Sequence, residues 1–200
     1  VLRAIERPHG RLAHAAAGAG GLVVQHHPGR ALIGAARALE DRRPDVGGRG
    51  LDGVDELAAL EVANSGHPIG AAEWEAGHVR DVLQFYSASP ERMSGKQIPV
   101  AGGLDVTFNE PMGVIGVITP WNFPMPIAAW GFAPALAAGN AVVLKPAEWT
   151  PLTSMRLAEL AAESGLPRDL FQVLPGRGSV VGERFVTHPD IRKIVFTGST

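Results

Sequence analysis

The sequence predicts an α/β fold in which helices flank a parallel sheet. Short β-branched, apolar runs alternate with helical segments over the second half of the chain, and turns rich in Gly, Pro and polar residues separate them. A strand–helix–strand–helix order of this kind implies parallel strands joined by right-handed crossovers. No apolar run approaches the ~18 residues that a membrane-spanning helix needs.

The pattern places five strands and five helices along the chain. The run 114–119 is apolar and β-branched, so we expect a strand buried on both faces. The segment 126–138 is apolar almost all round, which predicts a buried helix, irregular near Pro134. The expected strands are 106–109, 114–119, 141–144, 171–174 and 192–196. The expected helices are 55–64, 74–87, 126–138, one that begins after Thr150, and 180–187.

Two side-chain expectations concern the helix that follows Thr150. Thr150 is a residue type that caps helices, and Pro151 suits the first helical position. Arg156 and Glu159 lie three residues apart, and we expect them to form a solvated face of that helix.

The first 54 residues differ in composition from the rest. Positions 1–50 hold eight Arg and no Lys, and 12–21 is almost entirely Ala and Gly. Neither 12–21 nor the Gly-rich stretch 46–53 shows the sustained periodicity of a helix or a strand. We therefore expect a poorly ordered N-terminal segment, 1–54, ahead of a folded unit, 55–200. An alternative is that part of this segment is a GC-rich gene read out of frame.

Charge and composition narrow the classes of partner and of chemistry. The formal net charge is −2, which argues against nucleic acid or an anionic membrane surface as a partner. The opening lacks the pattern of a signal peptide, so the expected location is cytoplasmic. The chain has no cysteine, so no residue in it can serve as a thiolate nucleophile or ligand. The pair His26-His27 has no third ligand nearby, and we predict no metal site.

Polar and Gly-rich motifs follow four of the expected strands. In open α/β sheets, ligands bind at the carboxyl ends of the strands, which is where these motifs fall. Taken alone, each motif is weak evidence for a binding site, because ordinary turns contain the same residue types. The motifs are Thr119-Pro120-Trp121-Asn122-Phe123-Pro124, Lys145-Pro146-Ala147-Glu148, the stretch from Pro175 to Gly182, and Phe196-Thr197-Gly198-Ser199-Thr200.

In this order and spacing the motifs resemble the aldehyde dehydrogenase superfamily. The match runs from Glu110 to Thr200, and a looser match reaches back to about Asp55. The resemblance implies a Rossmann-like fold, here incomplete, with 55–200 as part of the NAD-binding domain. It also implies an oxidoreductase that converts an aldehyde to a carboxylic acid with NAD(P).

The resemblance further implies roles for individual residues. Asn122 would be the catalytic residue that donates a hydrogen bond to the developing oxyanion. Glu148 and Lys145 would hold the adenosine ribose of the cofactor. A carboxylate accepts hydrogen bonds from the two ribose hydroxyls and repels a 2′-phosphate. Glu148 therefore favours NAD, while NADP stays possible. The spacing of Gly178 and Gly182 is not that of the common dinucleotide fingerprint. The implied cofactor-binding residues are Ile118, Thr119, Pro120, Trp121, Lys145, Ala147, Glu148, Gly178, Gly182, Phe196, Thr197, Gly198 and Ser199.

The family's chemistry also uses a nucleophilic Cys and a general-base Glu, in segments that follow the Phe-Thr-Gly-Ser strand. We therefore expect the 200 residues to be inactive alone, although the intact family member would act on a small-molecule aldehyde and form a homo-oligomer. The alternatives are a non-catalytic nucleotide-binding module and a gene remnant. The sequence does not identify the aldehyde.

Overall fold

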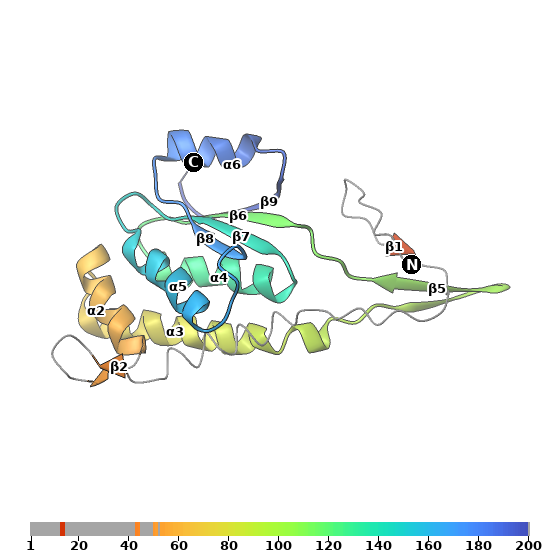
Figure 1. The fold of residues 1–200 in the computed structure, drawn as a ribbon, viewed down its shortest axis with the longest axis horizontal. Coiled ribbons are helices and arrows are strands. Elements are labelled where there is room, and N and C mark those ends of the chain that lie inside the picture. Colours follow the sequence, from red (N-terminus) through yellow and green to blue (C-terminus); the bar gives the residue numbers. More distant parts are fainter. Residues whose placement is uncertain (1–12, 15–42, 45–49, 52, 200) are drawn as a thin grey trace.

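The computed structural model describes residues 13–14, 43–44, 50–51 and 53–199 (Figure 1). The prediction that 1–54 is a poorly ordered segment, and the pair His26-His27, therefore fall almost entirely outside the described residues. The elements before the first described helix are the two-residue strands β1 (Ala13–His14), β2 (Arg43–Pro44) and β3 (Gly50–Leu51).

The elements from residue 53 onward follow the predicted order. The helices are α2 (Gly53–Ser65), α3 (Ile69–Ser87), α4 (Pro124–Ala137), α5 (Leu152–Glu163) and α6 (Glu183–Thr187), with a 3-10 turn η1 (Pro90–Arg92) and a π-helical turn η2 (Gly178–Gly182). The strands are β4 (Gln97–Val100), β5 (Gly103–Phe108), β6 (Val114–Ile118), β7 (Ala141–Lys145), β8 (Phe171–Val173) and β9 (Ile191–Phe196).

Four strands form one sheet in the order β8-β7-β6-β9. All three pairings are parallel, and Val117 of β6 lies opposite Leu144 of β7 and Val195 of β9. The predicted α/β fold with a parallel sheet is therefore confirmed. The strand β6 sits inside the sheet with hydrogen-bonded neighbours on both edges.

Helices cover β6 on both faces. A Cβ atom added at Gly116 would lie 3.0 Å from Phe185 of α6, and one added at Gly131 of α4 would lie 2.5 Å from Val117. Successive strand residues point to opposite faces, so α6 and α4 lie on opposite sides of the sheet. Figure 1 shows this layering, with α6 above the sheet and α4 and α5 below it. The expected burial of 114–119 on both faces is confirmed, because Ile115 and Val117 are buried on one face and Gly116 on the other.

The helices α2 and α3 add a further layer outside α4 and α5. The helix α3 packs along α4, and α2 packs against both α3 and α5. The core that joins these layers to the sheet contains fully buried Leu57, Val79, Met125 and Leu144.

The strands β4 and β5 form an antiparallel hairpin, which extends away from the helices in Figure 1. Every residue of β4 is exposed. The strand β1 pairs with the other edge of β5. The sequence did not predict β4, because the run has only 4 residues and contains Pro99, which argues against a strand.

The start of α5 differs from the prediction. Pro151, not Thr150, precedes the helix, and no side chain of its own segment caps it. The Thr150 hydroxyl is buried without a hydrogen-bond partner among the described residues. The cap comes from α2 instead, because the Leu152 N–H donates to Asn64 Oδ1 at 3.0 Å and Asn64 Nδ2 donates to Thr153 Oγ1 at 3.1 Å.

The prediction for Arg156 was also incomplete. Its side chain is only 19% exposed and does pair with Glu159, at 3.1 Å. It also pairs with Glu163 at 2.8 Å and, across the layer, with Glu56 of α2 at 2.5 Å. Arg156 therefore joins α5 to α2 rather than lying on a solvated face.

Two helices depart from their expected shapes. The helix α4 continues through Pro134 to Ala137, although we expected an irregularity there. The helix expected over 180–187 begins as the π-helical turn η2, and its α-helical part, α6, starts only at Glu183.

Candidate cofactor-binding edge and a buried Glu–His–Glu cluster

The loops that carry the predicted site residues leave one edge of the sheet side by side. Backbone hydrogen bonds continue the ladder past the strand ends: the Thr119 N–H donates to the Lys145 carbonyl at 3.2 Å, and the Thr197 N–H donates to the Ile118 carbonyl at 3.1 Å. These bonds fix the loops after β6, β7 and β9 relative to one another. The expected gathering at the carboxyl ends of the strands is therefore present.

Lys145 ends β7 and is almost fully buried, at 4% exposure. Its Nζ donates to the carbonyl of Pro146 at 2.9 Å. Burial lowers the pKa of the Lys145 ammonium, and the nearby Glu148 carboxylate opposes part of that shift. A buried amine with further protons to donate suits a ligand that brings hydrogen-bond acceptors.

Glu148 connects the end of β7 to the turn η2. Its Oε1 accepts a hydrogen bond from the Gly178 N–H at 3.0 Å, although the two residues are thirty positions apart. Gly182, at the end of the same turn, lies beside Lys145, because a Cβ atom at Gly182 would be 3.9 Å from Lys145 Cδ. The fold thus brings Lys145, Glu148, Gly178 and Gly182 to the same end of the sheet.

The space next to Gly178 is open. A Cβ atom there would meet no other atom within 4 Å, so no part of the described structure requires a glycine at this position. An open, exposed turn beside a buried amine and a carboxylate can admit a polar ligand close to the backbone. This arrangement fits a nucleotide cofactor.

The residues after β6 are more exposed. Trp121 is 62% exposed and Asn122 is exposed as well, just before α4 begins. Thr119 is buried, and its hydroxyl has no hydrogen-bond partner among the described residues. Pro120 is half-buried. Asn122 therefore lies at the predicted edge with its amide within reach of solvent.

The end of β9 adds an exposed aromatic ring. Phe196 is 56% exposed, and its ring would come within 2.9 Å of a Cβ atom at Gly198. A side chain at position 198 would displace this ring. Thr197, Gly198 and Ser199 are all exposed at this end of the sheet. The individual roles of these residues stay predictions.

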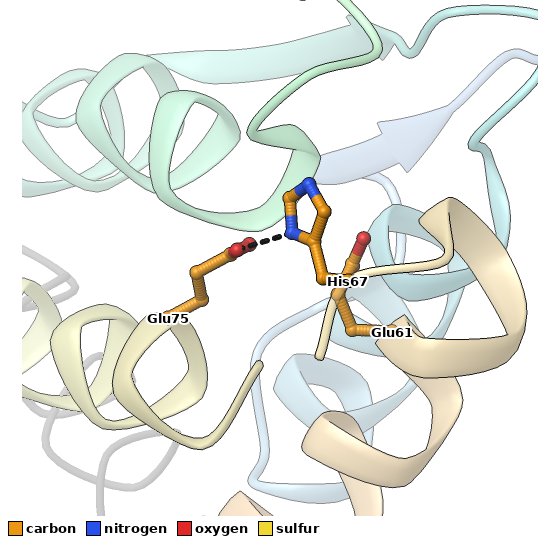
Figure 2. Close-up of side chains that lie close together, drawn as sticks. All are labelled: Glu61, His67 and Glu75. Carbon is orange, nitrogen blue, oxygen red and sulfur yellow. Dashed lines mark hydrogen bonds and ion pairs between the residues drawn. The ribbon is translucent and has the colours of Figure 1, made fainter. Parts of the chain in front are cut away.

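A second polar cluster, which the sequence analysis missed, lies away from that edge. It consists of Glu61 of α2, Glu75 of α3 and His67 between the two helices, drawn in Figure 2. Both carboxylates are fully buried, and His67 Nδ1 lies 2.5 Å from Glu75 Oε1. The one signal in the sequence was that Glu61 shares the helical spacing of Leu57 and Leu60, which places a carboxylate on an apolar face.

No helix in the part of the chain that the structure describes is long and apolar enough to cross a membrane. The parallel sheet and its two helical faces define the class as an open α/β protein, and such proteins bind their ligands at the polar carboxyl edge of the sheet.

Comparisons with known proteins narrow that class to one family. The model of the aldehyde dehydrogenase family matches residues 52–200. The chain belongs to this family. It is 43% identical over 145 residues to Omega-crystallin of Enteroctopus dofleini, a match that covers 72% of this chain and 29% of that protein.

Solved structures agree with the family assignment. PnpE from Pseudomonas sp. WBC-3, solved in complex with nicotinamide adenine dinucleotide, is 37% identical and superposes with a TM-score of 0.78 over 86% of this chain and 34% of its own. Glyceraldehyde-3-phosphate dehydrogenase GapN from Methanocaldococcus jannaschii, complexed with NADP, is 28% identical with a TM-score of 0.77, over 86% of this chain and 36% of its own. The chain thus spans about a third of the length of these relatives.

Proposed function

We propose that the intact protein oxidises an aldehyde to a carboxylic acid with a nicotinamide cofactor, and that the 200 residues supply the cofactor-binding part. Family membership supports the reaction class. The observation that supports the cofactor assignment is the hydrogen bond from the Gly178 N–H to Glu148 Oε1. This bond holds a carboxylate and an open turn at the end of the sheet where Lys145 is buried.

The proposed cofactor is NAD. Glu148 would accept hydrogen bonds from the vicinal hydroxyls of the adenosine ribose, and its charge would repel a 2′-phosphate. Lys145 would donate to the same ribose. The structures of PnpE with NAD and of GapN with NADP show that both cofactors occur among similar proteins. We propose that Glu148 sets the preference in this chain. When bound, the nicotinamide would supply the hydride acceptor.

Asn122 would stabilise negative charge on the substrate oxygen. A side-chain amide donates a hydrogen bond without a proton to lose, which suits an oxyanion. Asn122 lies at the same edge as the proposed ribose site, in the loop that leads into α4. Because the 200 residues contain no cysteine, we propose that they do not oxidise aldehydes on their own. The cytoplasmic location, the homo-oligomer and the division at residue 54 stay predictions.

Calorimetric titration of the purified chain with NAD and with NADP tests the cofactor assignment. The variant Glu148→Gln keeps an oxygen that can accept from the Gly178 N–H but removes the charge. We expect it to weaken NAD binding by about tenfold, since a hydrogen bond to a charged group contributes about 1.5–3 kcal/mol, and to narrow the preference for NAD over NADP. The matched control is Glu110→Gln, which removes the charge of an exposed glutamate elsewhere.

Two results would contradict the proposal. One is unchanged NAD affinity in Glu148→Gln, and the other is tighter binding of NADP than of NAD by the unmodified chain. Aldehyde-dependent formation of NADH by the purified 200 residues would separately refute the proposed inactivity.

A further inference from the structure

The cluster of Glu61, His67 and Glu75 is buried between helices. Glu61 and Glu75 have no exposed surface, and the side chain of His67 is 21% exposed. One ligand-type atom from each residue lies within 4.8 Å of the others. Figure 2 shows the Glu75 carboxylate facing the imidazole, with the Glu61 side chain, from the neighbouring helix, beside the ring.

The charges of this cluster do not balance. Burying an ionised carboxylate is costly unless a cation or several hydrogen bonds compensate it. Among the described residues, the only cationic group in contact with either carboxylate is His67, which can carry one positive charge against two negative ones.

The hydrogen bonds of the cluster are also incomplete. Glu75 Oε2 is buried and has no hydrogen-bond partner among the described residues. Both oxygens of Glu61 lie 3.4 Å from the Asn64 amide, at the long limit of a hydrogen bond. A buried carboxylate oxygen without a partner is unusual in a folded protein, and Glu75 Oε2 keeps its lone pairs available to a ligand.

We infer that Glu61, His67 and Glu75 bind a divalent transition-metal ion, with Zn²⁺ as the best match. An imidazole nitrogen with two carboxylate oxygens is a ligand set that zinc accepts, whereas Mg²⁺ and Ca²⁺ prefer oxygen alone. Zinc bonds of ~2.0–2.2 Å place tetrahedral ligands about 3.4 Å apart. The atoms of the cluster therefore need only small shifts to surround one ion, and water can complete the coordination.

Metal binding would replace the hydrogen bond between His67 and Glu75. Both groups must present lone pairs to the ion, so any proton held between them would leave to solvent. The positive charge of the ion would then balance the negative charges of the Glu61 and Glu75 carboxylates. This inference departs from the expectation of no metal site, which considered only His26-His27.

The position of the cluster indicates a structural role. The His67 ring contacts the Phe123 ring, with centroids 5.6 Å apart, and Phe123 directly follows Asn122. An ion that fixes His67 between α2 and α3 would therefore also steady the loop that leads into α4. The inference does not depend on the proposed cofactor, because the metal can be measured without it.

The test is a titration of the purified, chelator-treated 200-residue chain with Zn²⁺ by calorimetry, and with Co²⁺ by visible absorption. We expect one Zn²⁺ per chain, proton release, and a higher Tm when zinc is present. Glu75→Gln, which preserves size and shape, and His67→Ala should each weaken binding by more than about tenfold. Circular dichroism of each variant checks that it is folded.

Matched controls separate this site from other histidines. The double variant His26→Ala/His27→Ala and the variant His188→Ala, whose histidine lies 3.9 Å from Asp190, should bind Zn²⁺ as the unmodified chain does. The inference is overturned if the unmodified chain binds no Zn²⁺ at submillimolar concentration. It is also overturned if folded Glu75→Gln and His67→Ala keep full affinity, or if the His26/His27 variant loses it.

Discussion

Gly131 offers a direct test of how α4 lies on the sheet. A Cβ atom at this position would come within 2.5 Å of Val117 Cγ1, well inside ordinary carbon–carbon contact, and Val117 is itself 1% exposed. Gly131→Ala therefore combines two opposing effects. Ala is favoured over Gly in a helix interior by ~0.8–1.0 kcal/mol, and overpacking a filled core costs ~1–3 kcal/mol.

Gly77 supplies the matched comparison. It also lies inside a helix, α3, but a Cβ atom there would meet nothing within 4 Å. Gly77→Ala should therefore gain up to ~1 kcal/mol of unfolding free energy. Because only Gly131→Ala overpacks the core, its unfolding free energy should be about 1–3 kcal/mol lower than that of Gly77→Ala.

Urea denaturation of the two variants and the unmodified chain, followed by circular dichroism, measures the difference. With a slope of ~2 kcal/mol per molar urea, a gap of ~2 kcal/mol separates the two midpoints by about 1 M. If Gly131→Ala raises the midpoint as much as Gly77→Ala does, α4 does not pack on Val117 as described, and the reasoning fails.

Three further predictions concern α2, α3 and α5, all measured by urea denaturation. Asn64→Ala removes the cap of α5 that Leu152 depends on and should lower the unfolding free energy by ~0.5–2 kcal/mol. Arg156→Gln leaves Glu56 and the two carboxylates of α5 without their cation, and should cost ~1–3 kcal/mol. Burial raises the pKa of Glu75 above its ordinary 4.5, so the folded chain holds that proton more tightly than the unfolded chain. This contribution is complete below pH 4.5 and is lost as the pH rises through the folded pKa, so Glu75→Gln, without metal, should flatten the pH dependence of stability in that window.

Each of these has its own comparison. Asn109→Ala removes an exposed asparagine of the hairpin region and should change stability less than Asn64→Ala. Arg80→Gln breaks a pair with the exposed Asp81 and should cost less than ~1 kcal/mol. Glu73→Gln changes an exposed glutamate on the same helix as Glu75 and should leave the pH dependence as it is. Equal effects within any of these pairs would contradict the described contacts.

The fold was predictable wherever local pattern and burial agree. The apolar run of β6 and the apolar α4 identified the buried centre of the sheet, and the turn residues that follow β7 and β9 identified its polar edge. The residue patterns of β6 and α4 suffice to predict these elements because their side chains are almost all buried.

The contacts that the sequence did not reveal join residues far apart in the chain. Asn64 caps a helix that begins 88 residues later, and Arg156 reaches Glu56 across 100 positions. Local rules instead favoured Thr150 as the cap and Glu159 as the sole partner, since both are neighbours in sequence. His67 and Glu75 are only eight positions apart, but Glu61 joins them from α2, which packs against α3.

The strand order β8-β7-β6-β9 has a consequence for how the chain folds. The strand β6 is synthesised first of the four, yet one of its edges pairs with β9, the last. That edge keeps its backbone N–H and C=O groups unpaired until β9 has left the ribosome, and such an edge is prone to pair with other chains. Parallel pairing over so long a separation is also intrinsically slow. Slower translation between β8 and β9 would prolong this exposure and so increase the demand for a chaperone.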